Sequence, residues 1–93
     1  MVKQKIKKIR YKLDLIDDKL LLVIKKRVSL VNKVIQIKQT KKEIVDKKRI
    51  NSILKRIKKK SIKLKIDPMI SRNIWNAMIK SFIKYEYKKF KKK

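Results

Sequence analysis

The chain has 93 residues, which is enough for one domain of ordinary size and too few for two. It contains no Cys and no His, so a disulfide framework is excluded and the commonest metal ligand and general base are absent. With no Gly and one Pro, it also lacks a glycine-rich phosphate loop and the usual residues of β-turns. The composition therefore predicts an all-α protein and disfavours metal-dependent or triad chemistry.

The charge is strongly positive, with 32 Lys and Arg against 7 Asp and Glu and a net charge of +25. Such a balance favours an anionic partner: nucleic acid, a membrane surface or a small polyanion. The longest apolar run covers only residues 20–24, far short of the roughly 20 residues of a membrane span. The basic residues 1–10 are followed by no apolar core or cleavage site of a secretory signal. We expect a cytoplasmic protein with no membrane partner.

Residues 3–39 are predicted to form one long helix, because they lack Pro and Gly and their apolar residues recur at alternating steps of three and four. The stripe consists of Ile6, Ile9, Leu13, Ile16, Leu20, Val23, Leu30, Val34 and Ile37, and it widens at Leu21, Leu22, Ile24, Val28 and Val31. A helix of this size is roughly 55 Å long, whereas a compact chain of this length has a radius of gyration of about 12 Å. Its own chain cannot cover it, so we predict an intertwined homodimer.

Two further helices are predicted after a polar connection at residues 39–44. Asp46 can cap a helix that runs to about residue 65, and Asp67 followed by Pro68 is a typical start of a third. The second helix has its apolar positions at Ile50, Ile53, Leu54, Ile57 and Leu64. The third is expected to bury Ile70, Ile74, Ala77, Met78 and Ile83, with Trp75 and Ile79 beside them. Residues 88–93 are predicted to fray, which completes a three-helix protomer.

Arg27 occupies a position of the apolar stripe in the heptad register of the first helix. Because a buried, unpaired guanidinium is costly, it needs an anion, either in a structural ion pair or in a ligand carboxylate or phosphate. Lys38 lies 11 residues later, roughly 16 Å along and within about 20° of the same helix face, so the two can converge on one small ligand. Arg10 lies about 25 Å before Arg27, so it can join such a site only from a partner chain.

Charged residues in the other two helices also occupy unfavourable positions. The second helix opens with three cations, including Arg49, where the helix dipole favours anions. Glu86 follows Ile79 and Ile83 on or next to the apolar face of the third helix. It either pairs with a lysine or acts as a hydrogen-bond donor when protonated.

Together these segments resemble the all-helical chorismate mutase family over residues 9–86. The resemblance is carried by IRYKLDLIDDKLLLVIKKRVSLVNKVIQIK, by DKKRINSIL with its D-x-x-R at Asp46 and Arg49, and by KIDP. It implies an intertwined dimer with two sites, no cofactor, and chorismate as the small-molecule substrate. In this arrangement Arg27 and Arg10 of the partner chain would hold the substrate carboxylates. Lys38 would reach the ether oxygen and a carboxylate.

The resemblance also implies roles for residues of the second and third helices. Asp46 and Arg49 would shape the pocket around the ring hydroxyl, and Glu86 would face the breaking ether bond. To donate to an ether oxygen Glu86 must be protonated, which favours activity at mildly acidic pH. The pericyclic conversion of chorismate to prephenate requires no nucleophile, metal or general base, so a chain without His or Cys can be a complete enzyme of phenylalanine and tyrosine biosynthesis.

Two positions depart from the usual mutase pattern. Ile50 stands where mutases carry a Glu that binds the substrate hydroxyl, and Phe82 replaces a Ser near the substrate. Both substitutions resemble the related isochorismate-pyruvate lyases, which form salicylate, so lyase activity is the alternative within the family. A regulatory relative that has lost catalysis also stays open.

A basic helical nucleic-acid-binding protein is the alternative from another class. It is supported by the net charge alone, because the lysines are spread over all faces and the arginines are not clustered. Only non-specific binding of nucleic acid is expected.

Overall fold

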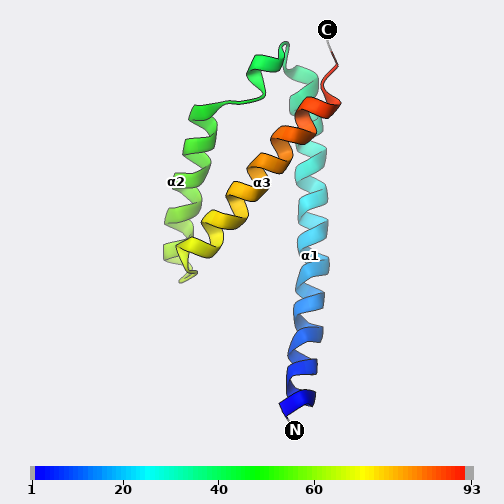
Figure 1. The fold of residues 1–93 in the computed structure, drawn as a ribbon, viewed down its shortest axis with the longest axis vertical. Coiled ribbons are helices and arrows are strands. Elements are labelled where there is room, and N and C mark those ends of the chain that lie inside the picture. The colour runs from blue at the N-terminus through cyan, green and yellow to red at the C-terminus, as the bar shows by residue number, and fades with distance from the viewer. Residues whose placement is uncertain (1, 92–93) are drawn as a thin grey trace. The chain divides into compact units, whose positions relative to one another are not determined.

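The protein is all-α, as the composition predicts. The structure is a computed structural model that describes residues 2–91. Its elements are helix α1 (Val2–Ile37), a short 3₁₀ helix η1 (Lys41–Glu43), α2 (Lys47–Lys63) and α3 (Pro68–Lys89), with no strand among the described residues (Figure 1). The chain divides into two compact units, residues 1–34 and 35–93.

The first unit is a single long helix. Within it Arg27, Val28 and Val31 are half-buried, and Arg10 is exposed. The exposed apolar side chains of α1 include Ile6, Ile9, Leu13, Ile16, Leu20, Leu21, Leu22, Val23, Ile24, Leu30 and Val34. A lone helix has no core of its own, and these side chains lie at the spacing of an amphipathic stripe. The predicted helix is confirmed, although it ends at Ile37 and not at Gln39.

The second unit is built around the pairing of α2 with α3, which lie side by side as a helical hairpin (Figure 1). Ile53, Ile57 and Ile79 form its buried cluster. The partly buried residues packed against this cluster are Ile50, Leu54, Trp75 and Ile83. The helix-period spacing of these residues explains why α2 and α3 each present one apolar face to the other.

The two predicted helix starts are confirmed by their caps. The Asp46 carboxylate accepts a hydrogen bond from the backbone N–H of Arg49 at 3.0 Å, and the Asp67 carboxylate accepts one from that of Met69 at 2.9 Å. Each carboxylate satisfies a backbone donor that has no partner within the helix and complements the helix dipole. Pro68 occupies the first turn of α3, where its missing N–H costs nothing.

The buried face of α3 differs from the prediction. Of the residues predicted to be buried, Ile70, Ile74 and Ala77 are exposed, and Met78 and Ile83 are half-buried. The buried residues of α3 are Ser71, Ile79 and Glu86. The buried face thus carries a serine and a carboxylate, and a pattern of apolar residues cannot locate polar side chains that are buried. Trp75 and Ile79, which we expected beside the face, pack in or against the core.

Three smaller expectations were also wrong. Leu64 is exposed at the end of α2, not on its buried face. Ile44, in the predicted polar connection, is buried and follows η1. Residues 88 and 89 belong to α3, so the predicted fraying does not begin at Lys88; residues 92–93 of that tail lie outside the described part.

The turn after α2 contains a residue in an unfavourable backbone conformation. Lys65 has φ of 60°, and its N–H donates to the carbonyl of Ile62 at 3.1 Å. The left-handed region costs a residue with a Cβ roughly 1–2 kcal/mol, and glycine avoids this cost. We therefore expect Lys65→Gly to raise the free energy of unfolding by about 1 kcal/mol and the Tm by about 4–8 °C.

This prediction is checked by thermal unfolding followed by circular dichroism at fixed protein concentration. The control is Lys60→Gly within α2, which should lower the Tm because glycine weakens a helix interior. A Lys65→Gly variant that melts at or below the wild-type temperature would contradict the assignment of strain to Lys65.

Candidate functional site

An ion pair between Lys38 and Glu86 is the central feature of the candidate site. The Lys38 Nζ donates a hydrogen bond to the Glu86 Oε1 at 2.9 Å, and the two side chains are 18% and 11% exposed. This joins the segment after α1 to α3 across 48 positions of the chain. A charge-assisted hydrogen bond in a partly buried position fixes both groups more firmly than a surface pair would.

The position of Lys38 is set by the local turn as well as by Glu86. α1 ends at Ile37, and the backbone N–H of Gln39 donates to the Glu43 Oε2 at 2.9 Å. Lys38 is thus one residue beyond the end of α1, whereas the sequence analysis placed it within the helix, on the same face as Arg27. Of the two interpretations of Glu86, pairing with a lysine is the one that the structure shows.

Asp46 and Arg49 lie together at the start of α2, as the D-x-x-R spacing requires. The Asp46 carboxylate is occupied by the backbone N–H of Arg49, and both side chains are exposed. A hollow of about 420 Å³ beside them is lined by Lys42, Glu43, Val45, Asp46, Lys47 and Lys48. The capping role of Asp46 is thus established, whereas its role toward a ligand stays a prediction.

Ile50 and Phe82 contribute apolar surface to the second unit. Ile50 packs against the buried cluster of α2 and α3. The half-buried ring of Phe82 meets that of Tyr85 edge to face, with 6.5 Å between centroids and 76° between planes. Phe82 precedes Glu86 by one helical turn on α3, so the two side chains occupy neighbouring positions on one helix face. Tyr85 is not among the predicted site residues.

Arg10 and Arg27, the remaining predicted residues, belong to the first unit. The 17 positions between them correspond to about 25 Å along the axis of α1, so one small ligand cannot touch both on the same chain. Their relation to Lys38 and Glu86 stays a prediction. The half-buried state of Arg27 agrees with its position on the apolar stripe.

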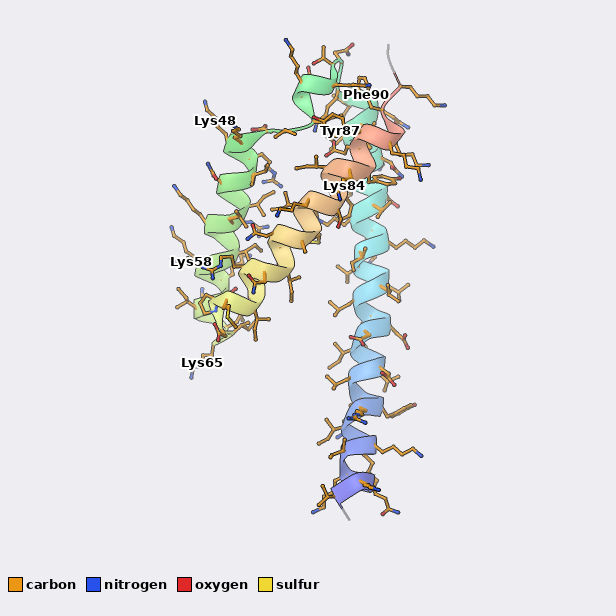
Figure 2. All side chains as sticks on the ribbon, in the orientation of Figure 1. Lys48, Lys58, Lys65, Lys84, Tyr87 and Phe90 are labelled. Atoms are coloured by element: carbon orange, nitrogen blue, oxygen red, sulfur yellow. The ribbon has the colours of Figure 1, made fainter. Side chains whose placement is uncertain are left out.

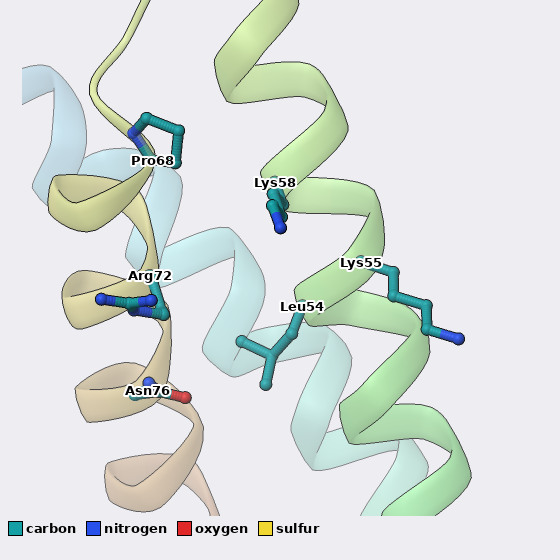
Figure 3. A pocket seen from close by; sticks show the side chains of 6 residues that line it. All are labelled: Leu54, Lys55, Lys58, Pro68, Arg72 and Asn76. Atoms are coloured by element: carbon teal, nitrogen blue, oxygen red, sulfur yellow. The ribbon is translucent and has the colours of Figure 1, made fainter.

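A separate cavity lies between α2 and α3, with a volume of about 260 Å³ (Figure 3). Its lining residues are Leu54, Lys55, Lys58, Pro68, Arg72 and Asn76, none of which is a predicted site residue. In Figure 3 Leu54 lies between the two helices, whereas Lys55 extends away from α3. The cavity is therefore not the site centred on Lys38 and Glu86.

Comparison with known families now decides the relationship. The model of the family described as chorismate mutase type II matches residues 9–87, which is most of the chain. The chain belongs to this family. Comparisons with curated proteins and with solved structures found no match.

Membership supports an activity of the chorismate mutase type, which is an isomerisation of a small molecule. The match agrees with the all-helical architecture, and it covers nearly the same residues as the resemblance found in the sequence, 9–86. None of the helices among residues 2–91 is long and apolar enough to cross a membrane.

Proposed function

We propose that the protein is a homodimeric, cytoplasmic chorismate mutase that converts chorismate to prephenate in phenylalanine and tyrosine biosynthesis. The observation that carries the proposal is the partly buried pair of Lys38 and Glu86 in a chain that matches the family over residues 9–87. An ammonium and a carboxyl group held in contact provide a cation and, on protonation, a hydrogen-bond donor. Both can act on an ether bond that breaks with charge developing on oxygen.

The reaction needs positioning and electrostatic stabilisation more than reactive groups. The rearrangement joins two ends of one molecule as the ether bond breaks, so holding the substrate in a compact conformer removes much of the entropic cost. Arg27 and Arg10 of the partner chain are proposed to hold its carboxylates, with Asp46 and Arg49 at the ring hydroxyl. Lys38 is proposed to stabilise negative charge on the ether oxygen.

The proposed dimer accounts for the exposed stripe of α1. Apolar side chains repeat along this helix from Ile6 to Val34, and most of them are exposed in the single chain. Exposed apolar surface of this extent marks an interaction site, and a second copy of α1 carries a stripe of the same spacing. Arg27 would then lie within the covered surface, where an anionic ligand stabilises it.

The function is tested by incubating the purified protein with chorismate and following the ultraviolet absorbance of the substrate. We expect enzyme-dependent loss of chorismate and formation of prephenate at mildly acidic and neutral pH. Loss no faster than the uncatalysed rate at both pH values would rule out mutase activity.

Lyase activity is the second candidate, because Ile50 packs with the apolar cluster and Phe82 with Tyr85. Neither side chain can accept a hydrogen bond from a substrate hydroxyl. The same assay with isochorismate, read by salicylate fluorescence, distinguishes the two reactions. Fluorescence that rises with isochorismate in the absence of chorismate turnover would replace the mutase assignment with the lyase.

Glu86→Gln tests the role proposed for Glu86. An ionised carboxylate only accepts hydrogen bonds, whereas the carboxamide of Gln also donates them. The variant would place a donor at the ether oxygen and release Lys38 from the ion pair, so it should raise kcat/KM at neutral pH by about tenfold.

The measurement is kcat/KM at neutral pH for the wild type and the variant. Asp14→Asn is the matched control, because Asp14 is an exposed carboxylate of α1 that has no proposed role in the site. An unchanged or lower kcat/KM in Glu86→Gln would show that a donor at position 86 does not assist the reaction.

A further inference from the structure

The end of α2 and the turn that joins it to α3 expose three large aliphatic side chains. Ile62, Leu64 and Ile66, here called the apolar tip, are 58%, 69% and 42% exposed. The turn is held by hydrogen bonds: the N–H of Ile66 donates to the carbonyl of Ser61 at 2.8 Å and that of Leu64 to the carbonyl of Lys60 at 2.9 Å. The exposure is therefore a property of an ordered turn at the end of the hairpin (Figure 1).

The interior near this turn is filled by small polar residues instead. Ser61 and Ser71 are 4% and 6% exposed, and the Ser61 hydroxyl donates to the carbonyl of Ile57 at 2.7 Å. Burying the aliphatic side chains would stabilise the fold, whereas leaving them in water does not. The stability of the single chain therefore does not explain why the aliphatic side chains of the apolar tip are exposed while the two serines are buried.

The charge around the apolar tip has one sign. Lys59, Lys60, Lys63 and Lys65 lie within about one helical turn of it, and Lys65 marks the end of the hairpin in Figure 2. None of the four forms an ion pair with any residue in the range 2–91. Residues 47–66 contain no Asp or Glu, and the nearby Asp67 carboxylate is bound to the N–H of Met69.

We propose that the apolar tip docks the protein on a membrane surface that contains anionic lipids. Aliphatic side chains on a convex turn fit a deformable apolar layer better than a preformed pocket, and the surrounding ammonium groups reach the phosphates at the level of the headgroups. Charge complementarity selects the anionic surface. Binding of this kind places the protein on the surface of the bilayer and does not require a helix that crosses it. The proposal departs from the expectation, drawn from the sequence, that the protein has no membrane partner.

The test is co-sedimentation of the purified protein with vesicles of phosphatidylcholine alone or with roughly 30% phosphatidylglycerol. The wild type is expected to bind the anionic vesicles only. The paired change Ile62→Ser and Leu64→Ser should weaken this binding by at least about tenfold. The matched control is Val2→Ser with Ile37→Ser, which removes two exposed aliphatic side chains elsewhere and should change binding by less than about twofold.

Three results would overturn the proposal. No binding by the wild type removes it outright. Equal binding by the tip and control variants would mean adsorption by net charge alone. A change in oligomeric mass of the tip variant, measured by light scattering, would place the tip in an interface between protein chains.

A second readout does not depend on folding of the double variant. The chain has no Cys, so Leu64→Cys carries a polarity-sensitive fluorophore at one defined place. Its emission should shift to shorter wavelength on anionic vesicles, whereas a label at Lys55→Cys, in the middle of α2, should not shift. Equal shifts, or none, at the two positions would contradict insertion of the tip.

Discussion

Replacing Arg27 with alanine is expected to lower kcat/KM for chorismate by roughly 10²–10³, while helical content and dimer mass stay unchanged. Arg27 interrupts the apolar stripe of α1 and is half-buried. If a substrate carboxylate is its partner, the guanidinium holds the reacting conformer, and that contact is lost in the variant.

The measurement is steady-state kinetics together with light scattering and circular dichroism. Arg72→Ala is the matched control, since Arg72 is exposed on α3 and lines the separate cavity between α2 and α3. An Arg27→Ala variant with wild-type kcat/KM would show that the site lies elsewhere. An inactive variant that has also lost its dimer would mean that Arg27 acts in assembly.

Lys38→Ala is expected to reduce both activity and stability. The rate should fall by roughly 10²–10³, because no other cation is proposed at the ether oxygen. The free energy of unfolding should fall by about 2 kcal/mol, because Glu86 is left in a mostly buried position without its 2.9 Å partner. Thermal unfolding and kinetics on the same preparation measure the two losses.

A second variant separates catalysis from folding. Lys38→Met combined with Glu86→Gln leaves no buried charge, so most of the stability should return while the activity should not. If the double variant regains activity along with stability, Lys38 contributes only to the fold. If Lys38→Ala is as stable as the wild type, the ion pair adds nothing to the folded state.

The helices and their starts could be predicted from the sequence because local rules decide them. Spacing of apolar residues specified α1 and α2, and the capping residues Asp46 and Asp67 specified where α2 and α3 begin. The buried face of α3 could not be predicted in this way. It includes Ser71 and Glu86, whose burial depends on what lies opposite them and not on their own polarity.

The candidate site also combines features that local sequence rules decide with features that depend on distant residues. The pairing of Glu86 with a lysine was one of two interpretations of the sequence, and no local pattern could name Lys38 as the partner across 48 positions. Lys65 is a further example, because its left-handed conformation follows from the geometry of the hairpin and not from the preference of lysine. The roles of Arg10 and Arg27 depend on a second chain, so they stay predictions.

The sharing of each site between two chains is tested most directly by mixing two inactive variants. Arg10→Ala and Arg27→Ala are each expected to be inactive alone. When equal amounts are unfolded and refolded together, half of the dimers combine both chains, and each mixed dimer has one site with both arginines intact. The mixture should therefore recover about one quarter of the wild-type activity. A mixture that remains as inactive as its components would contradict a site built from two chains.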